Sequence, residues 1–77
     1  MKAIRDLFIS IERTDIDEGM TNLVSDDIID SIDIMALVAA IEKSYKAPLK
    51  AEFIVSESFE SFAAIKAMLE KAYGVAQ

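Results

Sequence analysis

The chain has 77 residues, which is enough for one domain with one core and too few for two. It contains neither cysteine nor histidine, so disulfides and Cys- or His-ligated metal sites are excluded and the most common general base is missing. The net charge of −6 disfavours binding to nucleic acid or to an anionic membrane surface and favours basic protein partners.

No apolar run approaches the roughly 18 residues that a membrane span needs. Charged residues at Lys2, Arg5 and Asp6 come too early for the apolar part of a signal peptide. We therefore expect a cytoplasmic protein without a membrane span, and a monomer.

The first predicted element is a helix over about residues 2–13. Ile4, Leu7, Phe8 and Ile11 recur at helical spacing, whereas Ile9 falls off this stripe. Residues 14–30 then lose the pattern and are rich in residues that favour turns, which predicts a long loop. Scattered apolar residues should anchor this loop to the core: Ile16, Met20, Leu23, Val24, Ile28 and Ile29.

The second predicted helix runs from Ser31 to about residue 45. Ser31 is a good N-cap, and the negative charge of Asp33 in the first turn complements the helix dipole. Pro48 should stop any continuation. The expected core stripe consists of Ile34, Leu37, Val38, Ile41 and Tyr45.

A short third helix is predicted near residues 50–55, because a strand over 53–55 would find no pairing partner. The last helix should begin at Ser58 or Ser61 and end at a C-terminal cap formed by Gly74. Its expected inner face consists of Phe62, Ile65, Leu69 and Tyr73. The prediction is one all-α domain over residues 1–77: a four-helix bundle with three main helices, a short third helix and a long loop between helices one and two.

The negative charge is concentrated in one interval. Between Arg13 and Lys43 there is no lysine or arginine, and Ser31 lies inside this stretch. A solvated acidic loop would explain such a run without any function. The interval holds eight carboxylates: Asp15, Asp17, Glu18, Asp26, Asp27, Asp30, Asp33 and Glu42.

These acids do not predict catalysis. A hydrolase with paired carboxylates needs a cleft that excludes water, for which so short a chain has little room. A calcium loop is poorly matched, because Gly19 follows Asp15 and Asp17 too early and no suitable glutamate follows. Ser31 has no histidine to activate it as a nucleophile, so we expect no enzyme activity. Another enzyme could instead modify the Ser31 hydroxyl, since a phosphodiester there would face the positive end of the helix.

The run Asp30-Ser31-Ile32-Asp33, with the apolar helix that leads to Glu42 and Tyr45, resembles the acyl and peptidyl carrier proteins. The resemblance extends over nearly the whole chain. It implies an acyl-carrier-like bundle in which Ser31 receives 4′-phosphopantetheine from coenzyme A. A holo-carrier synthase (a phosphopantetheinyl transferase) would catalyse this step with Mg²⁺, and Asp30 would help to position the metal.

The resemblance also implies the later partners: acyl-transfer, ligase or synthase enzymes with basic docking surfaces, which would act on acyl or aminoacyl thioesters. Asp27 stands where many family members have glycine. Ala36 and Lys43 occupy positions that are often acidic in fatty-acid carriers, which leaves Asp33 and Glu42 as acidic partner contacts. Pro48-Leu49 followed by Glu52-Phe53 is similar to stand-alone D-alanyl and peptidyl carriers. We expect a specialised lipid, polyketide or peptide pathway.

Independently of the family, helical geometry places Ile32, Met35 and Ala39 on a face away from the core. They would form an exposed apolar strip beside Ser31 that contacts partners. We expect Ile32 to be exposed, whereas burial of Met35 under the loop is an equal alternative. An acidic helical interaction module that is never modified is the alternative for the whole chain.

Overall fold

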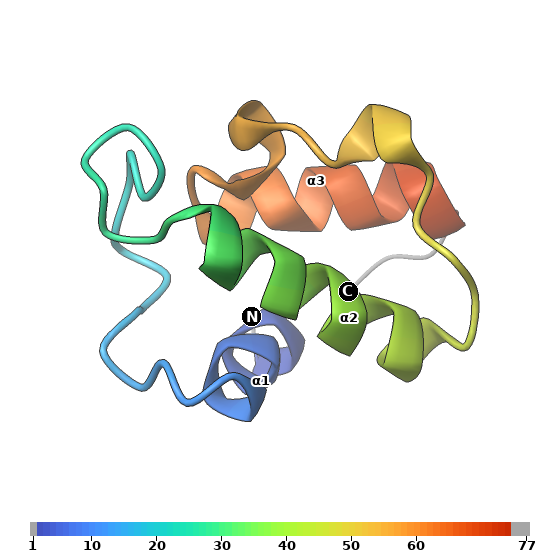
Figure 1. Cartoon of the computed structure of the whole chain (residues 1–77), viewed down its shortest axis with the longest axis horizontal. Helices are drawn as coiled ribbons and strands as arrows, with labels where there is room; N and C mark the ends of the chain where they lie inside the picture. The colour runs from blue at the N-terminus through green and yellow to red at the C-terminus, as the bar shows by residue number, and fades with distance from the viewer. Residues whose placement is uncertain (1, 75–77) are drawn as a thin grey trace.

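The computed structural model describes residues 2–74 and contains three α-helices and two short 3-10 helices. α1 (Lys2–Ser10), α2 (Ser31–Tyr45) and α3 (Phe62–Tyr73) are the main elements. Figure 1 shows α2 and α3 lying across the view and α1 seen almost end-on. The described part of the chain has no strand and no helix suited to crossing a membrane. The all-α prediction is thus confirmed, with 3-10 turns in place of a third α-helix.

α1 buries the stripe that its spacing predicts, with Ile4, Leu7 and Phe8 in the core and Ile9 largely exposed. The helix ends at Ser10, three residues before the predicted end at residue 13. Glu12 adopts a left-handed backbone (φ 66°), its N–H donates to Ile9 O, and Arg13 N–H donates to Phe8 O. This pair of bonds is a Schellman motif, which closes the helix without a glycine to signal it.

The long segment 11–30 is anchored to the core as predicted. Ile16, Leu23 and Ile29 are fully buried. The other four apolar residues of the segment are partly buried against the same cluster: Ile11, Met20, Val24 and Ile28. Residues 23–28 form one turn that also ends in a Schellman motif, with Asp27 left-handed (φ 56°) and Ile28 N–H donating to Leu23 O.

α2 buries Leu37, Val38 and Ile41, whereas Ile34 and Tyr45 are partly buried. The helix ends through Lys46, which is left-handed (φ 55°), before Pro48 is reached.

The chain after α2 differs from the single short helix predicted near residues 50–55. Two 3-10 turns are found instead, η1 (Ala51–Phe53) and η2 (Ser56–Phe59). Apolar burial at Leu49 and Phe59 holds this stretch in place. The 3-10 form suits short connectors because it closes each turn with an i→i+3 bond.

α3 begins at Ser61, whose hydroxyl accepts a bond from Ala64 N–H, so Ser61 and not Ser58 is the N-cap. Phe62, Ile65 and Leu69 are buried as predicted, and Tyr73 is partly buried. Gly74 (φ 70°) caps the helix, and its N–H donates to Glu70 O. This confirms the predicted C-terminal cap, where glycine adopts a left-handed backbone without steric cost.

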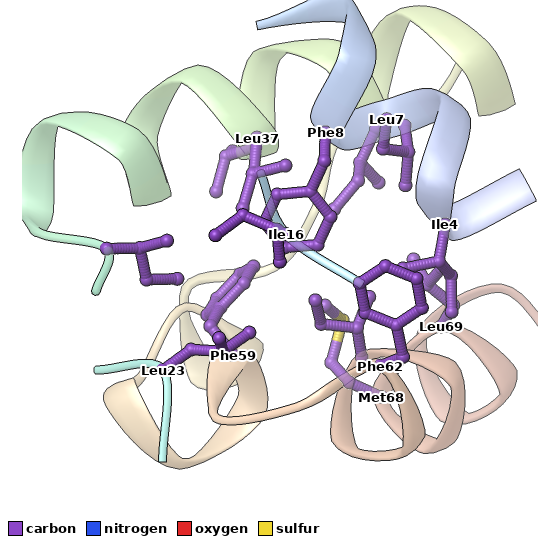
Figure 2. Packing of buried hydrophobic residues seen from close by; sticks show 14 of the residues in the cluster. Ile4, Leu7, Phe8, Ile16, Leu23, Leu37, Phe59, Phe62, Met68 and Leu69 are labelled. Atoms are coloured by element: carbon purple, nitrogen blue, oxygen red, sulfur yellow. The ribbon is translucent and has the colours of Figure 1, made fainter. Parts of the chain in front are cut away.

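One core joins the three helices and both connecting segments (Figure 2). The rings of Phe8 and Phe62 stack with centroids 5.3 Å apart, which links α1 to α3. Phe59 from η2 is fully buried beside Leu23 of the long segment. At the C-terminal ends of α2 and α3, the rings of Tyr45 and Tyr73 stack at 4.3 Å, and Tyr73 Oη donates to Ala47 O.

Candidate functional site

Ser31 is the first residue of α2 and is exposed, but it is not the N-cap that the sequence predicted. Asp30 has the extended backbone of an N-cap, and its Oδ1 accepts a bond from Asp33 N–H at 3.0 Å. In return, Asp33 Oδ2 accepts a bond from Asp30 N–H at 3.2 Å, which completes a capping box. Aspartate and serine are equally good N-cap residues, so the sequence did not distinguish Asp30 from Ser31. The predicted N-cap therefore lay one residue too late.

This shift leaves the Ser31 hydroxyl without a structural task. Among residues 2–74, its Oγ takes part in no hydrogen bond. The N–H groups of Ser31 and Ile32 are in the first turn, where a helix offers no internal acceptor. Of the two Asp30 oxygens, Oδ1 caps the helix, whereas Oδ2 accepts no bond from the described residues. An exposed hydroxyl therefore stands at the positive end of a helix, next in the sequence to a residue with a free carboxylate oxygen.

Arg13 is the residue of this site that the sequence analysis missed. Its Nη1 donates to Asp33 Oδ2 at 2.6 Å, and its Nη2 donates to the carbonyl of Ile28 at 2.8 Å. The same guanidinium forms a two-point pair with Asp15, with Nε–Oδ1 at 3.1 Å and Nη2–Oδ2 at 3.2 Å. Arg13 thus neutralises part of the acidic interval that it borders in the sequence.

The Arg13–Asp15 pair also sets the ionisation of both groups. The hydrogen bond from Arg13 lowers the pKa of Asp15 below its ordinary value. The hydrogen bond to Asp15, and then the charge of Asp33, raise the pKa of Arg13. Asp15 and Arg13 therefore remain charged over the whole neutral range.

The predicted apolar strip is present: Ile32 is 77% exposed, Met35 is 59% exposed, and Ala39 is exposed on the same helix. The exposure of Ile32 is confirmed, and for Met35 the structure decides between the two alternatives in favour of exposure. They are the two most exposed of the large apolar side chains described, and their role as a contact surface stays a prediction.

The two acids predicted to contact partners already have hydrogen-bond partners within the fold. Asp33 is held by Arg13 and by the capping box. Glu42 is partly buried, and its Oε2 accepts a bond from Leu49 N–H at 2.8 Å. Their role toward partners stays a prediction, and the structure gives each of them an internal role. The exposed acids that precede Ser31 most closely in the sequence are Asp26, Asp27 and Asp30.

A second clamp that the sequence did not reveal holds the long segment to the start of α3. Glu60 Oε1 accepts bonds from Val24 N–H (2.9 Å) and Ser25 N–H (3.1 Å), and Ser25 Oγ donates to Glu60 Oε2. The backbone of Leu23 donates to Glu60 O at 2.9 Å. The Ser25 hydroxyl, followed by the backbone N–H groups, lowers the pKa of Glu60. A carboxylate fixed in this way holds the segment that precedes Ser31.

Two other kinds of site were considered from the sequence: a calcium loop and a pair of catalytic carboxylates. Among residues 2–74, no group of three or more acidic side chains is arranged to hold a metal ion. Asp15 is paired with Arg13, and Asp17 Oδ1 accepts a bond from Gly19 N–H, so both carboxylates have partners within the fold. A groove of about 420 Å³ between η1, η2 and α3 contains none of the predicted site residues.

Comparisons of the chain with protein-family models, with curated proteins and with solved structures found no match. The functional assignment therefore depends on the Asp-Ser motif and on the geometry around Ser31.

Proposed function

We propose that this chain is a carrier protein of the acyl and peptidyl carrier type, with the acyl-carrier-like arrangement of helices, and that Ser31 is its 4′-phosphopantetheine attachment site. The observation that carries the proposal is the exposed Ser31 hydroxyl, free of hydrogen bonds among residues 2–74, at the start of a 15-residue helix. In a protein without cysteine, the arm would supply the thiol that thioester chemistry requires.

The residues present fit a phosphodiester at this position. The first-turn N–H groups of Ser31 and Ile32 are open, and the dipole of α2 favours a negative charge at this end. The capping box keeps the backbone of the first turn ordered without using the Ser31 side chain. The free Oδ2 of Asp30 is an oxygen of the kind that Mg²⁺ prefers, which suits the proposed role of Asp30 beside the metal of the transferase.

Asp27 supports the resemblance at the point where the sequence departs from it. Carrier proteins often have glycine at this position, and the backbone here is left-handed (φ 56°), a conformation that glycine adopts freely. Aspartate is among the few other residues that tolerate it. Aspartate in place of glycine at position 27 is therefore compatible with the left-handed backbone that glycine would adopt there.

The proposed modification is a phosphoryl transfer from coenzyme A. The Oγ of Ser31 would form a new bond to the phosphorus that carries pantetheine. The bond from this phosphorus to the oxygen of 3′,5′-adenosine bisphosphate would break, and the hydroxyl proton would pass to a base of the transferase. The carrier would contribute position and charge, which is the usual division of labour when the catalytic groups belong to the partner.

The surface around Ser31 would serve the partner enzymes. Ile32 and Met35 offer apolar contact area, and the exposed acids Asp26, Asp27 and Asp30 would attract a basic docking surface. We place such a carrier in the cytoplasm, as a monomer that is loaded with acyl or aminoacyl groups by a ligase, synthase or acyl-transfer enzyme of a specialised lipid, polyketide or peptide pathway.

The test is incubation of the protein with coenzyme A, Mg²⁺ and a broad-specificity phosphopantetheinyl transferase, followed by intact mass spectrometry. Wild type should gain the mass of one phosphopantetheinyl group, and Ser31→Ala should gain none. Ser44→Ala, which changes another exposed serine of α2, is the matched control and should be modified like wild type.

Circular dichroism should show that Ser31→Ala unfolds at the same temperature as wild type, because Asp30 and not Ser31 caps α2. An unmodified wild type, or modification of Ser31→Ala, would contradict the carrier function and favour an unmodified acidic interaction module.

A further inference from the structure

Arg13 is fixed at both ends of its side chain. Its backbone N–H donates to Phe8 O as the last bond of the Schellman motif that closes α1. Its side chain is only 23% exposed, and its guanidinium binds Asp33 in the first turn of α2 and the carbonyl of Ile28. Asp15 holds the outer edge of the same group. Arg13 therefore joins the end of α1 to both sides of the segment that contains Ser31.

We propose that Arg13 is a positioning residue for the modification of Ser31, because its guanidinium holds residues 28 and 33 on either side of the Asp30-Ser31 pair. This inference rests on the proposed carrier function. The Arg13 side chain thus hydrogen-bonds to a residue before Asp30-Ser31 and to a residue after it. Arginine suits this task, since its planar group presents several donors in a rigid fork.

The held segment is short, and its other ties are the capping box and buried Ile29. Asp30 and Ser31 are both exposed, and the apolar anchor next to them is Ile29, whose N–H donates to Leu23 O. Without Arg13, the carbonyl of Ile28 and one side of Asp33 would turn to water, and the entry into α2 would have more conformational freedom. The transferase would then meet Asp30 and Ser31 in the reactive arrangement less often, which lowers the rate of the chemical step.

If Arg13 acted only through its charge, its removal would make the carrier a better substrate of the transferase and not a worse one. Removing a positive charge from an acidic surface strengthens its attraction to a basic partner, which lowers KM. Loss of positioning lowers kcat and leaves KM near its original value, because Ile32 and Met35 remain on α2 for docking. The sign and the location of the kinetic effect thus distinguish the two roles.

The experiment measures kcat and KM for phosphopantetheine transfer from coenzyme A to this carrier, as substrate of the transferase, for wild type and variants. Arg13→Gln should lower kcat about tenfold at unchanged KM. Arg13→Lys should lower it only about threefold, because one ammonium group keeps the charge but cannot span all three contacts. Arg5→Gln, the same change at an exposed arginine of α1, is the matched control and should keep the kcat of wild type.

Asp33→Asn weakens the same contact from its other side, since an asparagine oxygen in the place of Asp33 Oδ2 can still accept the bonds from Asp30 N–H and Arg13 but has no negative charge. It should lower kcat by less than Arg13→Gln, and the double variant should be no slower than Arg13→Gln alone, as expected for two halves of one contact. Circular dichroism at the assay temperature checks folding, and if Arg13→Gln is unfolded, Asp33→Asn decides the question.

Folded Arg13→Gln and Asp33→Asn proteins with wild-type kcat, or a lowered KM as their only change, would overturn the positioning role. Wild type that accepts no phosphopantetheine would instead overturn the carrier function itself, so the two failures can be told apart.

Discussion

The two connections between the helices are held in place by different forces. The connection over 11–30 has buried anchors, but its backbone is also clamped by charged side chains: Arg13 binds the carbonyl of Ile28, and Glu60 binds the N–H groups of Val24 and Ser25. The connection over 46–61 satisfies much of its backbone through local i→i+3 bonds in two 3-10 turns. Its main ties to the core are buried Leu49 and Phe59.

Because of this difference, the two connections should respond differently to pH and ionic strength. Apolar burial is insensitive to pH and ionic strength, so the 46–61 connection should hold until the whole domain unfolds. Clamps formed by charged side chains depend on the charge state of a few carboxylates and can release a segment locally. The backbone of the segment that leads to Ser31 is held at Val24, Ser25 and Ile28 by two charged side chains, whereas the 46–61 connection has one such bond, from Leu49 N–H to Glu42. Substitutions in both connections, and a change of pH, test this contrast.

Phe59→Ala should have the largest effect on stability. The side chain is fully buried in the core, and its removal should cost about 3–5 kcal/mol in the free energy of unfolding, measured by urea denaturation. Val55→Ala in the same connection is the control, because Val55 is 45% exposed and should cost less than about 0.5 kcal/mol. A small loss for Phe59→Ala would show that burial does not hold this connection.

Asp27→Gly should have a smaller effect, and in the stabilising direction. The left-handed backbone at Asp27 favours glycine, so the free energy of unfolding should rise by up to about 1 kcal/mol. Asp26→Gly removes the same charge at a neighbouring residue without a positive φ. It should lower stability by about 0.5–1 kcal/mol through the greater freedom of the unfolded chain. If both variants change stability equally, the left-handed backbone at Asp27 contributes nothing.

Glu60→Gln should have the smallest global effect and a clear local one. A neutral glutamine oxygen accepts hydrogen bonds from Val24 N–H and Ser25 N–H more weakly than a carboxylate does. Amide hydrogen exchange at Val24 and Ser25 should therefore become faster, whereas Leu37 in α2 should stay protected. Glu57→Gln in η2 is the matched control and should leave all three amides unchanged.

Acid should act in the same way as Glu60→Gln. Because the pKa of Glu60 is lowered in the fold, its clamp is fully present above the ordinary value of 4.5 and is lost as the pH falls through the lower folded value. Protection of Val24 and Ser25 that persists in wild type below that folded value would contradict an ionic clamp.

Helical periodicity was sufficient to predict the three helices and most of their buried residues. Their ends were harder to predict, because α1 and α2 terminate through Glu12 and Lys46 in left-handed conformations that these residue types rarely adopt. The cap of α2 was misplaced because Asp30 and Ser31 are both good candidates and only the backbone angles decide between them.

The two clamps could not be predicted from local sequence at all. Arg13 and Asp33 are 20 residues apart, and Val24 and Glu60 are 36 apart. In a helix, residues three or four positions apart are known to be neighbours, but no such rule applies to these pairs because irregular chain separates their members. The one available signal was the position of Arg13 at the edge of a long interval without any positive charge, which suggests in retrospect that this arginine faces the interval.

The stacked tyrosines at the far ends of α2 and α3 give the molecule an optical reporter. The chain has two tyrosines and no tryptophan, so its tyrosine emission and near-ultraviolet dichroism come largely from this one contact. Tyr45 lies at the opposite end of α2 from Ser31. Changes at the modification site that stay local would leave this signal constant, whereas any loosening of α2 against α3 would change it. Tyrosine fluorescence or near-ultraviolet dichroism could thus distinguish local opening from global unfolding without an added label.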